Sequence, residues 1–255
     1  MKLPILPVLS GIAIVLGTLA AQEPVRAPDG GTITHVDGVD LLAIPGRPLT
    51  GRSSVEWTRT LEDGGTVSVH EIANLARDSQ GRMYRERRNW VPTESGLEAP
   101  LTEMQFFDPI ARTKTICAVG PKECVVSTYH PRTLLIAMPV GPFANGTRFL
   151  TRETLGTDRI DGLDVTGTRE TTTVNAGVVG NSAPLVSTRE FWYSDEIQTN
   201  VAVTRIDPRE GKQVVRLIDL SLGEPDRRVF DLPKGFTVND ARNSAQRAQS
   251  SLPSN

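Results

Sequence analysis

The body of this chain is a succession of short strand-like segments separated by turn residues. Apolar and polar residues alternate through residues 66–70, and the turn before them, residues 62–65, reads Glu-Asp-Gly-Gly. Alternation with a period of two is typical of a strand with one buried face, and Asp-Gly is a favoured hairpin turn. Further turns at residues 78–81 and 207–211 again separate segments rich in Val, Thr, Ile or aromatic residues. This pattern indicates antiparallel strands joined in sequence order.

The sequence therefore predicts an all-β fold, an antiparallel meander that forms a curved sheet or half-barrel with only minor helix. Few segments place apolar residues at helical spacing over three turns. Trp192 faces one side of its strand, whereas Phe191 and Tyr193 face the other, so both faces of the sheet carry aromatic rings. A curled sheet covers such rings better than a flat one.

The N-terminal residues 1–21 have the layout of a secretory signal peptide. Lys2 precedes an uncharged, mostly apolar run that ends in small residues near positions 18–21. The alternative is a single anchoring helix, which the two prolines and two glycines within the run disfavour. We expect a periplasmic or secreted protein with no membrane span after signal cleavage.

The composition divides the rest of the chain into three parts. Residues 22–50 hold several prolines and glycines with weak periodicity, which predicts a loosely ordered lead-in. Residues 51–238 carry the strand signals and are long enough for one large antiparallel β domain. Residues 239–255 are poor in apolar side chains, which predicts a disordered tail.

The two cysteines of the chain, Cys117 and Cys124, lie in one short segment with a Gly-Pro turn signal between them. An even pair in an exported protein predicts a disulfide, here across a hairpin. The alternative is a redox-active pair, but the close CxxC spacing of such pairs is missing.

Motif searches disfavour an enzyme. Residues 70–74 begin like the HExxH zinc signature, but Asn74 replaces the second histidine and the segment alternates like a strand. The glycine-rich residues 141–147 lack the lysine of a phosphate loop, and no GxSxG elbow occurs. Residues 158–164 carry an aspartate at every third position, which fits either calcium or a plain hairpin turn. We therefore expect no catalytic site, cofactor or metal.

Arginines crowd the segment from residue 77 to residue 88. Arg85 and Arg87 share one strand face and are candidates for contact with anionic lipid headgroups or an acidic partner. The simpler interpretation is a solvated strand whose long charged side chains discourage edge-to-edge pairing. The formal net charge of the whole chain is -2, so electrostatics favours no nucleic-acid partner.

The last third of the chain carries three motifs in order. They are a Trp-Tyr strand at residues 192–193, an Asp-Pro-x-x-Gly turn at 207–211, and a closing Phe-x-x-Pro-x-Gly-Phe-x-Val segment at 230–238. The combination resembles a group of poorly characterised exported bacterial β-sheet proteins. It is more distantly similar to the lipoprotein-carrier (LolA/LppX-like) superfamily, which implies a curved antiparallel sheet around a hydrophobic cavity. The chain departs from that superfamily because it lacks an obvious long helix to plug a half-barrel.

The leading hypothesis is a non-catalytic binding protein of the cell envelope, which holds an apolar or lipid-like ligand on the concave face of the sheet. Its partner would be lipid or lipoprotein. The candidate lining residues are Trp57, Val67, Val69, Phe191, Tyr193, Val201 and Val203. The same residues would equally make an ordinary filled core. The alternative function is a structural or protein-interaction module without a small-molecule ligand, and the sequence does not indicate an oligomeric state.

Overall fold

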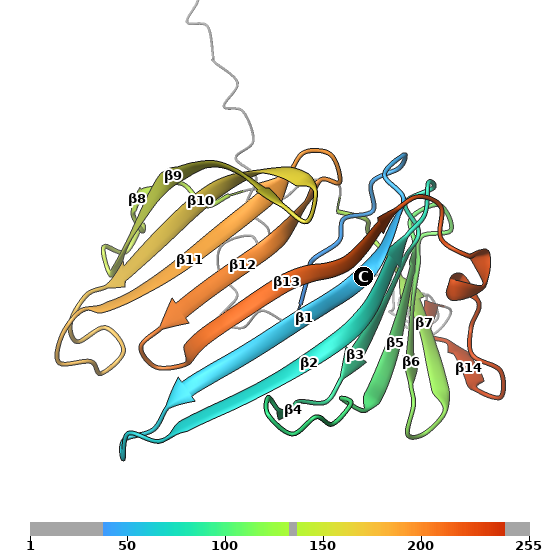
Figure 1. The fold of residues 1–255 in the computed structure, drawn as a ribbon, viewed down its shortest axis with the longest axis horizontal. Helices are drawn as coiled ribbons and strands as arrows, with labels where there is room; N and C mark the ends of the chain where they lie inside the picture. Colours follow the sequence, from blue (N-terminus) through green and yellow to red (C-terminus); the bar gives the residue numbers. More distant parts are fainter. Residues whose placement is uncertain (1–37, 133–136, 243–255) are drawn as a thin grey trace, which may run out of the picture.

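The computed structural model describes residues 38–132 and 137–242, and these are built almost entirely of β-strands (Figure 1). The predicted signal peptide, residues 22–37 of the lead-in and residues 243–255 of the tail lie outside the described residues. The strands are β1 (Leu49–Thr60), β2 (Thr66–Arg77), β3 (Met83–Arg88), β4 (Val91–Pro92), β5 (Leu101–Asp108), β6 (Thr113–Ala118), β7 (Glu123–Thr128), β8 (Gly141–Pro142), β9 (Arg148–Ile160), β10 (Leu163–Val174), β11 (Leu185–Ser194), β12 (Thr199–Asp207), β13 (Gly211–Leu222) and β14 (Thr237–Asp240). In this part of the chain, no helix has the length and apolarity needed to cross a membrane.

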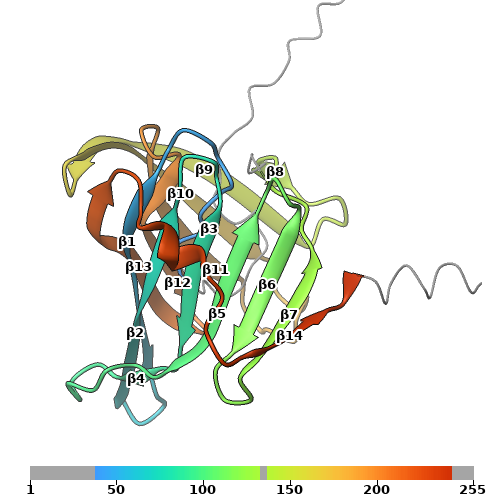
Figure 2. The same ribbon diagram turned by 90° about the vertical axis from the view of Figure 1, so that its right-hand side faces the viewer.

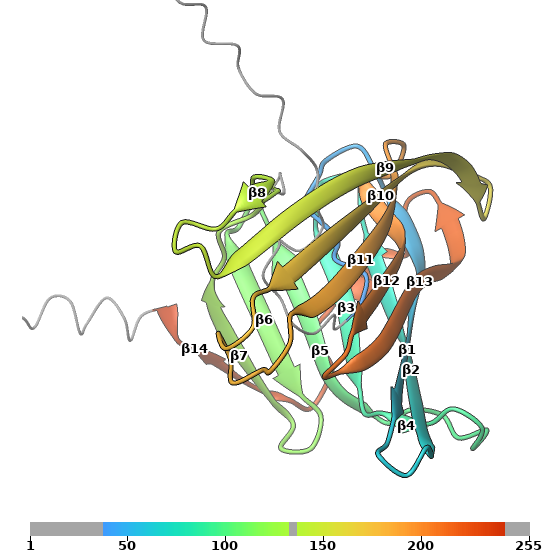
Figure 3. The same ribbon diagram turned by 90° about the vertical axis from the view of Figure 1, so that its left-hand side faces the viewer.

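All the described strands belong to one 14-stranded sheet. Its order is β14-β7-β6-β5-β3-β2-β1-β13-β12-β11-β10-β9-β8, and β4 pairs with β2 beside this path. Pairing is antiparallel except between β14 and β7, which are parallel. The sheet curves until its two halves face each other, as Figures 2 and 3 show from opposite sides. It is not closed into a barrel. The predicted all-β curved sheet is thus confirmed.

We call the side on which the two halves face each other the inner face. A row of apolar residues crosses four neighbouring strands there, with Val55 opposite Val215, Val215 opposite Val203, and Val203 opposite Phe191. All four are buried, and they belong to the larger of two apolar clusters. Because paired residues point to the same side of a sheet, the period-two pattern of each strand fills one continuous core.

The lead-in is more ordered than its composition predicted. Val39, Leu42 and Ala43 are buried, and Leu49 already belongs to β1 with none of its surface exposed. The described part of the segment that composition predicted to be loosely ordered, residues 22–50, thus contributes buried side chains, and β1 begins within it. These side chains add apolar burial that a count of prolines and glycines does not reveal.

Arg77, at the end of β2, holds this segment in place. Its guanidinium is completely buried and donates to the carbonyl oxygens of Leu42 (3.1 Å), Arg47 (2.8 Å) and Ile197 (2.6 Å). Burial lowers the pKa of Arg77 to about 10. One side chain thus ties the lead-in to the β11–β12 connection, which is far away in sequence.

The chain after β13 crosses the opposite, outer face of the sheet, and we call residues 226–236 the C-terminal strap. It contains the 3₁₀ helix η1 (Arg227–Phe230) and leads into β14 beside β7 (Figure 2). Arg82 on the outer face lies over the Phe230 ring, with 4.8 Å between guanidinium carbon and ring centroid. The closing segment at residues 230–238 follows the three antiparallel strands β11, β12 and β13, and β14 extends to Asp240, past the expected boundary at residue 238.

The predicted disulfide between Cys117 and Cys124 is present and joins β6 to β7. Both cysteines are buried on the outer face and cluster with Phe106. Phe236 of the strap packs against the same cluster. The disulfide and the ring of Phe236 thus belong to one apolar cluster near this edge of the sheet.

Candidate functional site

A groove of about 520 Å³ lies between the outer face and the C-terminal strap, and we call it the strap groove. Most of its surface is apolar. The residues from the sheet are Thr50, Gly51, Asn74, Leu75, Ala76, Tyr84, Glu86, Met104 and Phe106, and those from the strap are Arg228, Val229, Asp231 and Pro233. The volume falls within the range of about 300–1,000 Å³ that is usual for ligand pockets.

The floor of the strap groove follows from strand register. Tyr84 of β3 stands opposite Ala76 of β2 and Phe106 of β5, so all three point outward together. The rings of Tyr84 and Phe106 pack with centroids 5.3 Å apart. Met104 lies two residues along β5 from Phe106 on the same face, and its flexible thioether suits an adaptable apolar surface.

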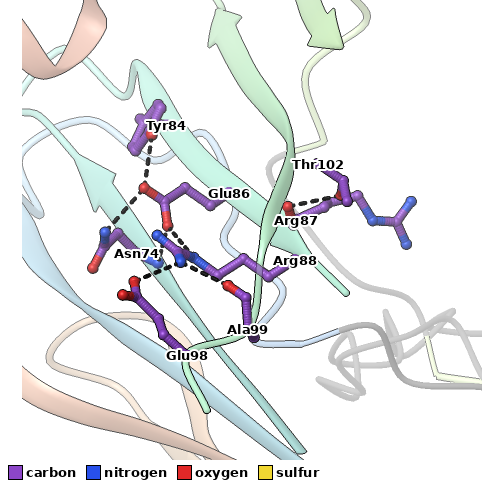
Figure 4. A network of polar contacts seen from close by, with 8 residues as sticks. All are labelled: Asn74, Tyr84, Glu86, Arg87, Arg88, Glu98, Ala99 and Thr102. Atoms are coloured by element: carbon purple, nitrogen blue, oxygen red, sulfur yellow. Dashed lines mark hydrogen bonds and ion pairs between the residues drawn. The ribbon is translucent and has the colours of Figure 1, made fainter. Parts of the chain in front are cut away.

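Glu86 forms the centre of a polar network at one end of the groove (Figure 4). Its carboxylate accepts hydrogen bonds from Tyr84 Oη (3.1 Å), Asn74 Nδ2 (2.9 Å), Asn74 N (3.1 Å) and Arg88 Nε (2.8 Å). Arg88 in turn donates to Glu98 and to the carbonyl of Ala99. The carboxylate is thus surrounded by donors and fixed in position.

The ionisation of this network argues against acid–base chemistry. Burial opposes the charge of Glu86, but hydrogen bonds from Arg88 and Asn74 outweigh it and lower the pKa of Glu86 below its usual value. Burial and the neighbouring Glu86 raise the pKa of Tyr84 above its usual range. Glu86 therefore stays ionised and Tyr84 stays a neutral phenol at neutral pH, so the pair has no tendency to exchange a proton.

We predict that Glu86→Gln lowers the free energy of unfolding at pH 7 by about 1–3 kcal/mol, because Arg88 loses its charged acceptor. In the folded wild type the depressed pKa of Glu86 contributes stability above the ordinary value of about 4.5. That contribution is lost as the pH falls from there through the folded-state pKa. Urea denaturation at several pH values should show that the free energy of unfolding falls less steeply with decreasing pH for Glu86→Gln than for the wild type. The variant Glu56→Gln, which changes an exposed residue, is the control and should behave like the wild type. The same pH dependence of stability in Glu86→Gln and the wild type would contradict a lowered pKa for Glu86.

A second, smaller cavity lies on the inner face, and we call it the inner pocket. Its volume is about 100 Å³, and Asp40, Arg85, Phe107, Tyr129 and Arg132 contribute to its wall. Arg132 Nη2 lies 3.0 Å from Asp40 Oδ2. Burial raises the pKa of Asp40 although Arg132 and Arg85 act against it. The pocket thus combines an apolar wall with several charged groups.

The predicted ligand-lining residues do not act as one set. Phe191, Val201 and Val203 are buried in the main core. Trp57, Val69 and Tyr193 are half-buried, and Val67 is 47% exposed near the β1–β2 turn. None of the seven lines the strap groove or the inner pocket. The three buried members of the set fit the alternative of an ordinary filled core.

The predicted anion contacts lie on the inner face. Arg85 stands opposite Gln105 and Arg87 opposite Glu103, so both arginines point to the same side. Arg85 donates to Gln105 and lines the inner pocket, whereas Arg87 does not line it. Both are half-buried side chains of the sheet interior rather than members of a solvated stripe.

Asp158, Asp161 and Asp164 surround the tight turn between β9 and β10, as the hairpin interpretation predicted. Asp161 and Gly162 both have positive φ, 48° and 84°. Among the residues that the structure describes, no group of three or more His, Cys, Asp or Glu side chains is placed to hold a metal ion.

Apart from Arg85 and the closing-segment residues Asp231 and Pro233, the residues that form the two cavities were not predicted as ligand contacts from the sequence. Tyr84, Glu86 and Met104 carry no local motif, and Asp40 and Arg132 come from segments without strand signals. The one available signal for the strap groove was the closing segment at residues 230–238, which supplies Asp231 and Pro233 to its lining.

No family model and no curated protein matches this chain. Several solved structures are similar to this chain at low sequence identity. An uncharacterized conserved protein from Thermus thermophilus has a TM-score of 0.42 at 9% identity, over 76% of this chain and 91% of that one. LprF from Mycobacterium bovis has a TM-score of 0.30 at 15% identity, over 75% of this chain and 90% of that one. The Mycobacterium tuberculosis lipoprotein LppX has a TM-score of 0.26 at 14% identity, over 74% of this chain and 91% of that one. Likeness at this level assigns neither a superfamily nor a function.

Proposed function

We propose that this chain is an exported, non-catalytic binding protein that holds an uncharged apolar or lipid-like ligand in the strap groove. The observation that carries the proposal is the groove itself, about 520 Å³ of mostly apolar space between sheet and strap. Export rests on the signal peptide predicted for residues 1–21 and fits a chain with a disulfide.

The lining favours an uncharged ligand. Ala76, Met104, Phe106 and Val229 offer apolar contact along the groove, and each buried methylene group of a ligand contributes about 0.8 kcal/mol. The carboxylate of Glu86 is already held by four hydrogen bonds. It therefore offers little to a charged ligand, and the groove selects for shape and apolar surface.

The strap supplies a wall that can yield to a ligand. None of the residues of η1 is buried, and only Val229 and Phe230 within it are half-buried, so few apolar contacts hold this turn against the sheet. Phe236 anchors the strap further along, in the cluster with the disulfide. A ligand could thus enter beneath η1 while the strap stays attached.

Titration with N-phenyl-1-naphthylamine, an uncharged fluorescent probe, tests the proposal. We expect saturable binding to the wild type, excited where tryptophan does not absorb. Met104→Trp fills the groove and should weaken binding at least tenfold. The control Val186→Trp adds the same ring at an exposed position of β11 and should leave binding unchanged.

Absence of saturable binding, or equal affinity in both variants, would contradict the proposal. Native mass spectrometry of protein purified from the periplasm adds a second test, because a ligand held in the groove should be retained as extra mass. A clean unliganded mass together with no probe binding would favour the alternative, an interaction module of the envelope.

A further inference from the structure

Two uncharged stretches of the chain meet at one end of the sheet. Residues 137–147 and 171–188 contain no Asp, Glu, Lys or Arg, although these residue types make up 23% of the chain. The first stretch includes β8 and the loop before β9, and the second includes the connection from β10 to β11. We call the two loops, residues 143–147 and 175–184, the loop tip. It lies at the left of Figure 1, whereas the C-terminal strap lies at the right.

Hydrogen bonds join the two loops of the tip. Asn175 donates through its backbone nitrogen to the carbonyl oxygen of Thr147 (3.0 Å) and through Nδ2 to that of Gly146 (3.0 Å). Within the shorter loop, the backbone nitrogen of Phe143 donates to the carbonyl oxygen of Arg148 (2.9 Å). The tip is therefore one structural unit and not two separate loops.

The longer loop satisfies its own backbone donors at its turn, residues 177–180. The nitrogen of Gly177 donates to the carbonyl oxygen of Asn181 (2.7 Å), and that of Val179 donates to Asn181 Oδ1 (3.1 Å). The nitrogens of Val178 and Gly180 make longer contacts, 3.4 and 3.5 Å, with carbonyl oxygens of the same loop. A backbone whose donors are already paired loses little when water leaves it.

Apolar side chains of the tip and of the strands that enter it are exposed. Val178 and Val179, at the turn of the longer loop, are 38% and 48% exposed. On the strands, Phe149 stands opposite Thr173, and Thr173 stands opposite Val186. Phe149 and Val186 are 46% and 49% exposed. An exposed apolar patch of this kind marks a surface that is covered by a partner.

A lipid surface suits the tip better than a protein partner does. Protein interfaces carry about one hydrogen bond per 100–200 Å², but the turn at residues 177–180 has already used its backbone donors. The two stretches also bring no charge that would have to leave water. Transfer of the valine side chains into the boundary between headgroups and acyl chains is favourable, because it buries apolar surface.

We propose that the loop tip docks this protein on the surface of a lipid bilayer. Val178 and Val179 enter the upper part of the acyl-chain layer, and Phe149 lies beside them. Because the two stretches supply no Lys or Arg, the attraction is apolar and requires no anionic lipid. Docking does not depend on a ligand in the strap groove, so either proposal can fail without the other.

Flotation with phosphatidylcholine vesicles tests the proposal. We expect the wild type to float with the vesicles. Val179→Asp should lower the partition coefficient at least tenfold, because a carboxylate is costly to place in the apolar layer. Val67→Asp is the matched control, since Val67 is 47% exposed near the β1–β2 turn, and it should float like the wild type. Both variants should bind N-phenyl-1-naphthylamine with the affinity of the wild type.

Val179→Trp and Val67→Trp give a second measurement, read against the three tryptophans of the wild type. Vesicles should shift the added emission of Val179→Trp to shorter wavelength, and phosphatidylcholine brominated on its acyl chains should quench it. Val67→Trp should show neither effect. The proposal would be overturned by a wild type that does not float, by equal flotation of Val179→Asp and the wild type, or by binding that requires anionic lipid. Loss of self-association in Val179→Asp, without vesicle binding by the wild type, would assign the tip to a contact between copies of the chain instead.

Discussion

Arg77→Leu should lower the free energy of unfolding by about 3–5 kcal/mol. The guanidinium is fully buried and donates to three carbonyl oxygens, those of Leu42, Arg47 and Ile197. Leucine fills part of the space but leaves the carbonyl oxygens of Arg47 and Ile197 without this donor, while the oxygen of Leu42 keeps only the hydrogen bond from Ile44 N (2.9 Å). Removal of a buried charge offsets part of this loss of stability, because burial disfavours the charged guanidinium and lowers the pKa of Arg77 to about 10. The unmade hydrogen bonds dominate because each costs about 1–3 kcal/mol.

Chemical denaturation of Arg77→Leu and Arg77→Lys, with Arg216→Leu as an exposed control, measures this effect. Lysine keeps the charge but cannot span three carbonyl groups as the planar guanidinium does, so it should lose most of the same stability. Hydrogen exchange should also show that residues 38–48 lose protection first. A loss below about 1 kcal/mol for Arg77→Leu would mean that the lead-in is held by other contacts.

The strands were predictable because their signals are local. Alternation and turn chemistry act over a few residues, and the turn at 207–211 is a good example. Gly211 has a φ of 89°, and a Cβ there would lie 2.2 Å from the carbonyl oxygen of Thr58. Only glycine meets both demands, so its presence marks the turn in the sequence. The disulfide between Cys117 and Cys124 was predictable for the same reason.

The coverage of each face was not predictable. The alternation of side chains along a strand shows that Tyr84 and Glu86 share a face, but it does not show what covers that face. Here the cover is a strap that lies more than a hundred residues later in the chain, which no local pattern connects to β3. The strap groove therefore emerged only with the folded structure.

The order of the lead-in was hidden for a different reason. Arg77 donates to backbone carbonyl groups, which every residue possesses. The segment around Leu42 therefore needs no particular side-chain pattern to be held against β2. Prolines and glycines predicted looseness correctly as a local tendency. A buried guanidinium from β2 overrides that tendency. Asp40, which lines the inner pocket, is held in the same segment by Thr199 Oγ1, which donates to its carbonyl oxygen (2.8 Å).

Phe191→Ala should lower the free energy of unfolding by about 3–5 kcal/mol while leaving probe binding unchanged. The ring is 3% exposed, stands opposite Val203 and lies beneath the Arg189 guanidinium at 5.3 Å. Alanine would leave a cavity among rigid strands that cannot collapse to fill it.

Val67 makes a matched comparison, because the sequence assigned it to the same ligand-lining set. It is 47% exposed near the β1–β2 turn, so Val67→Ala should cost less than about 0.5 kcal/mol. Urea denaturation and probe titration of both variants decide what the inner face does. If Phe191→Ala proved nearly as stable as the wild type but bound the probe weakly, the inner face would be an open ligand surface and the strap groove would lose its role. A large loss of stability with unchanged probe affinity would instead show that this face is a core, because a ring that lines a ligand site contributes to affinity and not mainly to folding.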